Sequence, residues 1–327
     1  MARAKHLVVI GASGGGIEAL RVIVGSLDED FPTPIAVVMH TSPQSPAVLD
    51  AILTRAGRLH ATNAVNGERL RAGHIYVAPP DLHLVIEPGT CRVTKGPREN
   101  RFRPAIDPLF RSAAQVYGPG AIGVILSGSL DDGTDGLLAI KRLGGRAIVQ
   151  DPLEALFPSM PQHAIENVDV DYILPLAEIG PLLARLTSLP VEAVIPEVPE
   201  QLQIEVKIAM EHNPLDAGLE RVGTPSKFAC PECHGVLFEL REQARLKFRC
   251  HTGHAYSVAS LLAAIGDGIE DSLWNSVRAL DEGQLLMTRM AEHLRSSHEG
   301  ADVSELLRRA DEARRQAEMV RQLVMQR

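Results

Sequence analysis

The sequence contains no apolar run long enough to cross a bilayer. Its first apolar run, Leu7–Ala12, is too short for the hydrophobic region of a signal peptide. Basic residues are not in excess, because 33 Lys and Arg stand against 41 Asp and Glu, which argues against non-specific nucleic-acid binding. Only four cysteines occur, as expected for a reducing compartment. We therefore expect a cytoplasmic protein with no membrane insertion and no nucleic-acid partner.

The 327 residues are enough for one full hydrophobic core and a second module. In the first 190 residues, short apolar runs alternate with helix-like stretches, which predicts an α/β fold with a doubly wound, mostly parallel sheet. The predicted strands are His6–Gly11, Ile35–His40, His74–Ala78, His83–Ile86, Cys91–Thr94, Ala121–Ser127 and Arg146–Val149. The predicted helices are Ile17–Leu27, Pro46–Ala56, Pro108–Tyr117, Asp135–Arg142 and Leu176–Leu186. The fourth and fifth strands are expected to form an antiparallel hairpin through Pro88-Gly89.

The rest of the chain divides by composition. Residues 1–188 are expected to form the α/β domain and residues 189–226 a proline-rich linker interrupted by a short strand, Leu202–Ile208. Residues 227–257 hold a Cys/His cluster, and residues 258–327 are predicted to form a helical hairpin. The last helix has an alanine-rich seam with spacings of three and four residues: Val303, Leu306, Ala310, Ala313, Ala317, Val320 and Val324.

Three reactive side chains follow three of the apolar runs. Ser13 lies in the glycine-rich turn after the first run, His40 ends the second, and Asp132 lies in a Gly/Ser-rich turn after Ala121–Leu126. Parallel strands place their carboxyl ends at one edge of the sheet, where ligands bind. A histidine can take the serine proton and a carboxylate can orient the histidine, so the pattern suggests a serine hydrolase.

Other interpretations compete with this one. The turn after the first strand also resembles the phosphate-binding turn of a short-chain dehydrogenase, but no tyrosine has a lysine four residues later, as the active sites of those enzymes require. Asp131, Asp132 and Asp135 could be ordinary turn residues. Asp131 also competes with Asp132 for the place of the orienting carboxylate.

A cysteine cluster indicates a metal site. Cys230-x-x-Cys233 is followed, after sixteen residues, by Cys250-x-x-x-His254, which is the ligand spacing of a zinc ribbon. We predict a structural Zn²⁺ held by these four side chains, with His251 and His234 as rival ligands. The intervening segments Val236–Leu240 and Leu246–Arg249 would be its strands. A catalytic zinc of the deaminase type also needs an upstream His-x-Glu motif, which this sequence does not contain.

Six segments together resemble a known family. They are Ile10-Gly11-Ala12-Ser13-x-Gly15-Gly16, Val38-Met39-His40, Ile75-Tyr76-Val77-Ala78-Pro79, Gly96-Pro97, Arg101-x-Arg103-Pro104-x-x-Asp107-x-Leu109-Phe110 and Leu126-Ser127-Gly128-x-x-x-Asp132-Gly133. This ordered set, within residues 4–188, resembles the catalytic domain of CheB, the chemotaxis protein-glutamate methylesterase family.

The resemblance implies an enzyme that needs no cofactor for catalysis. It implies Ser13 as nucleophile, His40 as general base and acid, Asp132 as orienting carboxylate, and oxyanion contacts from Gly14 and Ser129. The implied reaction hydrolyses glutamate γ-methyl esters on the helices of methyl-accepting receptors, and glutamine deamidation uses the same chemistry.

The sequence departs from the family pattern in two respects. Because the first strand begins near residue 6, we expect no receiver domain before it. The methionine usual in the turn before the aspartate is replaced, which weakens the assignment of Ser129. A non-catalytic scaffold that binds a signalling partner through the C-terminal module is therefore the alternative to an esterase. Arg98, Arg101 and Arg103 lie in a basic loop that we expect to steer an acidic substrate.

Overall fold

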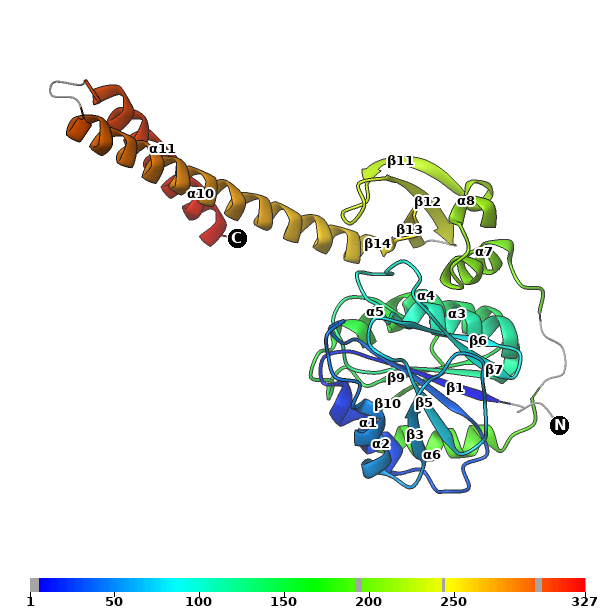
Figure 1. Ribbon diagram of the computed structural model, residues 1–327. Helices are drawn as coiled ribbons and strands as arrows, with labels where there is room; N and C mark the ends of the chain where they lie inside the picture. Colours follow the sequence, from blue (N-terminus) through cyan, green and yellow to red (C-terminus); the bar gives the residue numbers. More distant parts are fainter. Residues whose placement is uncertain (1–5, 192–195, 243–244, 298–301, 327) are drawn as a thin grey trace. The chain divides into compact units, whose positions relative to one another are not determined.

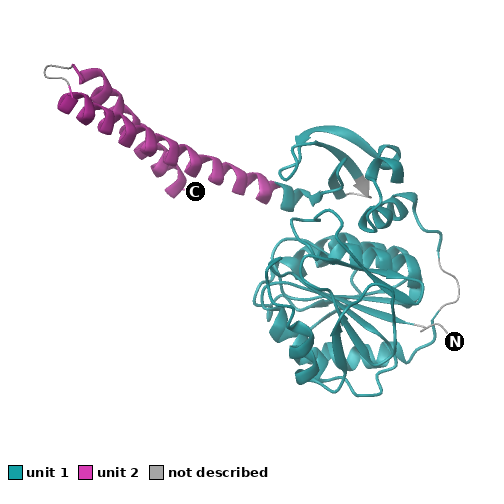
Figure 2. Cartoon of the chain, in the orientation of Figure 1, with its two compact units in different colours: residues 1–261 teal, residues 262–327 magenta. Residues whose placement is uncertain are grey.

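The computed structural model describes residues 6–191, 196–242, 245–297 and 302–326. It divides into two compact units, residues 1–261 and 262–327 (Figure 2). Residues 192–195 of the predicted linker, and residues 298–301 and 327 of the predicted hairpin, lie outside the described residues. None of the helices in the described part combines the length and apolar character that crossing a bilayer requires.

A seven-stranded parallel sheet lies at the centre of the first unit (Figure 1). The strand order is β10-β9-β8-β1-β2-β5-β3, so the central strand β1 pairs with β2 on one side and β8 on the other. The strands are β1 (Leu7–Ala12), β2 (Ile35–Met39), β3 (His60–Asn63), β5 (His74–Val77), β8 (Ala121–Ile125), β9 (Arg146–Gln150) and β10 (Tyr172–Leu174). The predicted doubly wound fold is confirmed, and β3 and β10 were not predicted.

Helices cover both faces of this sheet, which explains why β1 is continuously apolar. Leu7 and Val9 belong to the core beneath α3 and α4, whereas Val8 and Ile10 belong to the core beneath α1 and α6. Each side chain of β1 is therefore buried, whichever face of the sheet it points to. The helices are α1 (Gly16–Gly25), α2 (Leu49–Ala56), α3 (Ile106–Tyr117), α4 (Thr134–Arg142), α5 (Ser159–Asn167) and α6 (Leu176–Thr187).

The predicted antiparallel hairpin is present but belongs to a second sheet. Strands β6 (His83–Glu87) and β7 (Thr90–Thr94) pair with each other, and the short strand β4 (Glu68–Arg69) adds to β7. Gly89 occupies the turn with a φ of 80°, a conformation that costs glycine little. A short 3-10 helix, η1 (Gly118–Gly120), leads from α3 into β8.

The prediction of a strand at Leu202–Ile208 is wrong, because this segment belongs to the helix α7 (Glu200–Ala209). Its alternating apolar residues suggested a strand, but they serve two different faces of a helix. Leu202 and Val206 join the core of the α/β domain, while Ile204 and Ile208 pack on Ala217. A helix buried on two sides gives a pattern that period-two alternation imitates. The short helices α8 (Pro214–Ala217) and α9 (Leu219–Val222) follow.

The Cys/His module is a four-stranded antiparallel sheet in the order β11-β12-β13-β14. Its strands are β11 (Gly223–Ala229), β12 (Val236–Glu242), β13 (Arg245–Cys250) and β14 (Ala255–Ser257). The two predicted strands lie within β12 and β13. We call residues 223–257 the ribbon.

Two helices complete the chain, α10 (Val258–Ser297) and α11 (Ser304–Met325). In the second unit an ion pair joins Arg321 of α11 to Asp281 of α10 at 2.9 Å. The predicted seam faces inward, since Val303, Ala310, Ala313, Ala317 and Val324 are buried.

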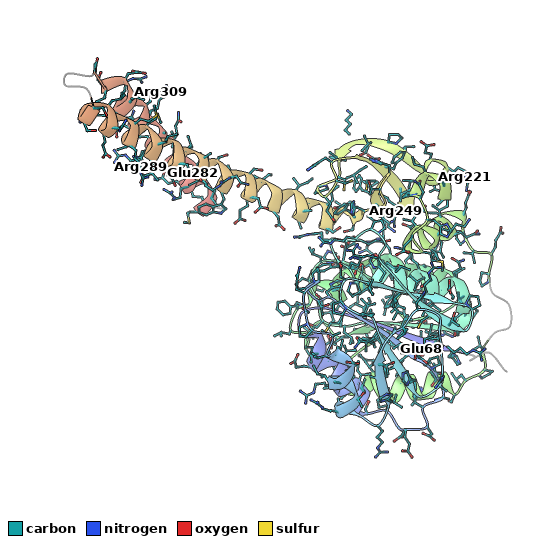
Figure 3. All side chains as sticks on the ribbon, viewed as in Figure 1. Glu68, Arg221, Arg249, Glu282, Arg289 and Arg309 are labelled. Atoms are coloured by element: carbon teal, nitrogen blue, oxygen red, sulfur yellow. The ribbon has the colours of Figure 1, made fainter. Side chains whose placement is uncertain are left out.

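Buried charges join the ribbon to the α/β domain. Alternate residues of β13 carry long cations, and Lys247, 3% exposed, contacts Glu205 of α7 at 2.8 Å and Asp135 of α4 at 3.3 Å. Arg249, labelled in Figure 3, lies 3.1 Å from Glu99. Burial raises the pKa of Glu205, but the cations of Lys247, Arg111 and Arg249 outweigh it and leave that pKa lowered. These carboxylates therefore take their counter-charges partly from Arg111 of α3 and partly from the ribbon.

Removing one partner of this network would leave a buried charge uncompensated. We expect Lys247→Met to lower the free energy of unfolding by about 3–5 kcal/mol. Lys227→Met, on the exposed part of β11, is the matched control and is expected to change it by less than about 0.5 kcal/mol. Urea unfolding followed by circular dichroism measures both, and equal stability of the two variants would contradict the assigned role of Lys247.

Candidate active site

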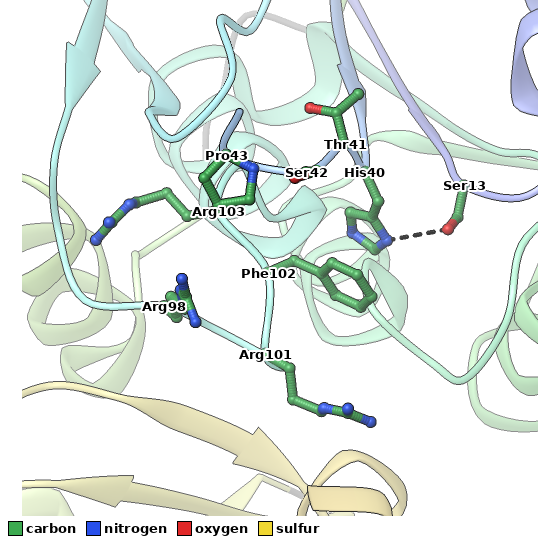
Figure 4. A pocket seen from close by; sticks show the side chains of 9 residues that line it. All are labelled: Ser13, His40, Thr41, Ser42, Pro43, Arg98, Arg101, Phe102 and Arg103. Atoms are coloured by element: carbon green, nitrogen blue, oxygen red, sulfur yellow. Dashed lines mark hydrogen bonds between the residues drawn. The ribbon is translucent and has the colours of Figure 1, made fainter. Parts of the chain in front are cut away.

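Ser13 and His40 come together at the carboxyl ends of β1 and β2. The Ser13 Oγ lies 3.2 Å from His40 Nδ1 (Figure 4). Neighbouring strand ends meet because the main-chain N–H of His40 donates to the carbonyl of Ala12, which continues the β1–β2 ladder beyond the strands. The ring of His40 stacks on Phe102, with ring centroids 3.7 Å apart and planes within 6°. The imidazole is thus held flat beside the serine.

Asp132 completes a hydrogen-bonded chain with these two residues. His40 Nε2 donates to Asp132 Oδ2 at 2.7 Å, which leaves Nδ1 as the acceptor that faces Ser13. Asp131, the rival carboxylate, points elsewhere: its oxygens accept from Ser257 Oγ at 2.6 Å and from Arg245 at 3.2 Å. The structure therefore places Asp132 rather than Asp131 against the histidine.

The Asp132 carboxylate is 1% exposed and is stabilised by donors from other parts of the chain. Its Oδ2 accepts from the N–H of Ile106 at 2.7 Å, and its Oδ1 accepts from Asn100 Nδ2 at 2.9 Å. Burial raises the pKa of this carboxyl, but the hydrogen bonds and charge of His40, with the donors Ile106 and Asn100, leave its pKa lowered. Asp132 is consequently held as an anion.

The first turn of α3 uses Asp132 as its cap. Ala105 precedes the helix and has no capping side chain, so the first N–H groups of α3 need an acceptor from elsewhere. Asp132 supplies it, at the positive end of the helix dipole. Asp107, in the same turn, has its pKa raised well above the usual range by burial and then by the neighbouring Asp132 and Asp135 carboxylates.

The predicted oxyanion contacts differ in their surroundings. Gly14 lies between Ser13 and the N-cap of α1, Gly15, and among the described residues no hydrogen bond uses the Gly14 N–H as donor. The Gly128 backbone packs so close to the Ser13 Cβ that a Cβ at position 128 would lie 2.8 Å from it. Ser129 is exposed on this same loop, so its role stays a prediction.

A cavity of about 390 Å³ opens onto Ser13 and His40. The three predicted arginines line it together with Phe102 and a short loop after β2, Thr41–Pro43 (Figure 4). Arg103 is engaged with Asp81 at 2.6 Å and with the carbonyl of Gly96 at 2.8 Å, so it shapes the wall. Arg98 is partly exposed and approaches Glu232 at 4.0 Å.

The four predicted metal ligands lie together in the ribbon. The ligand atoms of Cys230, Cys233, Cys250 and His254 are all within 4.8 Å of one another. The Sγ atoms of Cys233 and Cys250 are 3.6 Å apart. His254 Nδ1 lies 3.7 Å from the Sγ of Cys230 and 3.6 Å from that of Cys250. Tetrahedral zinc with its usual bond lengths separates such ligands by about 3.6–3.8 Å, so the donor set fits.

The surroundings of this cluster also suit a metal. Glu232 Oε2 lies 3.4 Å from His254 Nε2. A carboxylate that accepts a hydrogen bond from Nε2 would leave Nδ1 of the same ring to bind the metal ion. The rivals His251 and His234 are not members of the group. The fourth cysteine, Cys91, is buried in β7, where burial raises the pKa of its thiol to about 12.

The site contains two residues that the sequence did not suggest. Phe102 stacks on His40, and Asn100 binds Asp132. Both lie in the basic loop, where the arginines dominated the pattern, and no spacing rule marks an asparagine or phenylalanine for these places.

Comparison with known proteins covers the α/β domain. A family model described as CheB methylesterase matches residues 8–183. A putative protein-glutamate methylesterase/protein-glutamine glutaminase of Leptospira interrogans is 43% identical over 180 residues, which are 55% of this chain and 93% of that protein. A protein-glutamate methylesterase/protein-glutamine glutaminase of Anaeromyxobacter dehalogenans is 42% identical over 182 residues, 56% and 53% of the two chains.

A solved structure shows the same fold. The crystal structure of the Thermotoga maritima CheB methylesterase catalytic domain is 36% identical and superposes with a TM-score of 0.53. The similarity covers 55% of this chain and 98% of that one.

The arrangement of Ser13 and His40 predicts a nucleophilic serine. A fluorophosphonate should label Ser13 covalently, and His40→Gln should slow the labelling by about 10²–10⁴-fold because the proton acceptor is lost. Mass spectrometry of peptides locates the label. Ser42→Ala is the matched control, since Ser42 lines the same cavity but its hydroxyl hydrogen-bonds with Gln44 and, among the described residues, not with His40. Labelling that persists at the wild-type rate in Ser13→Ala would refute the prediction.

Proposed function

This chain belongs to the CheB methylesterase family, and on that premise we propose that it hydrolyses glutamate γ-methyl esters in a protein substrate. The products are a glutamate side chain and methanol. The observation that carries the proposal is the hydrogen-bonded chain from Ser13 through His40 to Asp132. As the resemblance to the chemotaxis methylesterases implies, the substrate proteins would be methyl-accepting receptors, and the enzyme would work in the cytoplasm.

The proposed reaction has two steps. Ser13 Oγ attacks the ester carbonyl while His40 Nδ1 takes its proton, and the Asp132 anion stabilises the imidazolium that forms. The N–H of Gly14, with a contact from Ser129, would stabilise the oxyanion at the positive end of α1. His40 then gives the proton to the departing methoxide oxygen, which leaves as methanol. Water hydrolyses the resulting acyl-enzyme by the same proton transfers in reverse roles.

Glutamine deamidation is proposed as a second reaction of the same site. Its acyl-enzyme is identical, and only the leaving group changes, from methanol to ammonia. Names of both relatives cited above include this activity. Apart from the substrate and water, all these steps use side chains and main-chain groups of this chain, so no cofactor is proposed for catalysis.

The arginines at the cavity rim are proposed to guide the substrate. Arg98 and Arg101 line the cavity with Ser13, and a receptor segment that carries several glutamates would be attracted to them. Arg103 is proposed to hold the wall in place through Asp81. This division predicts that the first two arginines contribute to substrate affinity rather than to the chemical step.

For the ribbon we propose a structural Zn²⁺ on Cys230, Cys233, Cys250 and His254. All four tetrahedral positions would be filled by protein ligands, which leaves no position for a reacting water. The ribbon is too small to fold on its own core alone, so the metal would supply much of its folding free energy. A signalling partner that binds through the ribbon and the C-terminal helices is compatible with this role.

Methanol release from a methyl-labelled receptor tests the esterase. The wild-type chain should release methanol, Ser13→Ala should release none, and Asp132→Asn should lower kcat by about 10³–10⁴-fold, since the histidine loses its orienting anion. Asp131→Asn is the matched neighbour and should lose far less activity than Asp132→Asn, because Asp131 faces Ser257 and Arg245 rather than His40. No release by the folded wild-type protein would favour the scaffold alternative.

Metal analysis tests the ribbon. Purified protein should contain one zinc per chain, and Cys233→Ser should lose it and lower the thermal stability of the ribbon. Cys91→Ala is the control, because that thiol lies outside the cluster and should leave the zinc content unchanged. Zinc retained in full by Cys233→Ser would show that the proposed ligand set is wrong.

A further inference from the structure

Asn100 has an unusually complete set of hydrogen bonds for a loop residue. Its Nδ2 donates to Asp132 Oδ1 at 2.9 Å and to Asp107 Oδ2 at 3.0 Å. Its Oδ1 accepts from the main-chain N–H of Ser257 and from Ser260 Oγ, both at 2.9 Å. The side chain is 5% exposed, so all four of its hydrogen-bonding positions are used away from water.

The orientation of this carboxamide follows from its partners. A main-chain N–H can only donate, so the atom that faces Ser257 must be the oxygen. The NH₂ group then faces the two carboxylates of Asp107 and Asp132. The main chain is fixed as well, because the N–H of Asn100 donates to the carbonyl of Ala255 at 2.8 Å and its φ is 49°. Asparagine tolerates this left-handed conformation better than most residues.

The donors to Asn100 come from the segment that follows the ribbon's ligands. Ser257 ends β14, and Ser260 lies in the first turn of α10. Strand β14 is paired with β13, which ends at Cys250, and the loop between the two strands carries His254. The placement of Ser257 and Ser260 therefore depends on the fold of the ribbon.

The neighbouring residue reinforces this contact. Glu99 is 2% exposed and accepts from Arg249 of β13 at 3.1 Å and from Arg111 of α3. Asn100 is thus clamped between the ribbon and the α/β domain by its own contacts and by those of Glu99. The residues that line the catalytic cavity all lie between positions 13 and 103, so none of the described ribbon residues lines that space. The ribbon meets the cavity wall at Arg98, whose carbonyl accepts from the N–H of Ala255 at 3.2 Å and whose side chain approaches Glu232 at 4.0 Å.

The contact matters for Asp132 because of how its two oxygens are used. Oδ2 binds His40 and the N–H of Ile106. Oδ1 has Asn100 at 2.9 Å, and its other donor, the N–H of Asp107, is at 3.5 Å. Without Asn100 the carboxylate would keep only a long contact on Oδ1 and could rotate, which would misalign the acceptor for His40.

We propose that Asn100 is a positioning residue for the triad, through which the ribbon fixes the Asp132 carboxylate and hence the catalytic histidine. The C-terminal module is by this inference a part of the catalytic apparatus, and turnover depends on its docking. The inference rests on the proposed serine chemistry but not on the identity of the substrate.

Fluorophosphonate labelling of Ser13 in the full-length chain tests this inference, because it reports on the triad whatever the natural substrate is. Asn100→Gly removes the carboxamide and keeps a residue suited to a positive φ. It should slow labelling by roughly 10- to 100-fold, as expected for loss of a hydrogen bond to a charged group. Ser260→Ala, which removes one donor to Asn100, should slow it by roughly 2- to 10-fold.

A double-mutant cycle separates positioning from general damage. In an Asp132→Ala background, Asn100→Gly and Ser260→Ala should cause no further loss, because both act through Asp132. Glu211→Gly is the matched control, since Glu211 also has a positive φ, 68°, but lies outside the site. It should label at the wild-type rate.

Methyl ester turnover by the same variants gives a second readout. Asn100→Gly should lower kcat and leave KM unchanged, because the cavity lining is intact. The proposal is overturned if folded Asn100→Gly and Ser260→Ala label at the wild-type rate, or if their losses persist in full without Asp132. Normal labelling of the wild type without methanol release would refute the methylesterase and leave this inference standing.

Discussion

The buried carboxylate of Asp132 is the constraint on which the rest of the site depends. An anion that is 1% exposed is costly unless donors surround it. The chain supplies them from three directions: the imidazole of His40, the first turn of α3 and the carboxamide of Asn100. Each donor is in turn fixed by something else, so the anion organises the strand end, the helix and the basic loop around itself.

The same requirement extends to the ribbon. Glu99, Glu205 and Asp135 are buried carboxylates of the α/β domain and α7, and their counter-charges come from Arg111 and from alternate residues of β13. Buried ion pairs add little net stability, but they tolerate only one relative placement of the groups involved. They therefore dock the ribbon in a defined register against the loop that carries Asn100. Specific docking is what a positioning contact at the triad requires.

Local sequence patterns predicted much of this architecture. The continuously apolar runs marked β1, β2 and β8, and the residues at their ends, Ser13, His40 and the aspartates after β8, do meet. The cysteine spacing likewise found four side chains that lie within 4.8 Å of one another. The pattern failed at Leu202–Ile208, where two buried helix faces imitated a strand, and it overlooked the short edge strands β3 and β10.

By itself the sequence determined the parallel sheet, the strand ends that carry the reactive groups and the four side chains that cluster in the ribbon, because each follows from periodicity or from short spacing along the chain. Only the tertiary structure decided between Asp131 and Asp132, since both occupy the same turn and differ in what they face. It alone brought Asn100 to Ser257, 157 positions away in the chain. Contacts at such separation depend on how whole elements pack, and no local pattern records them.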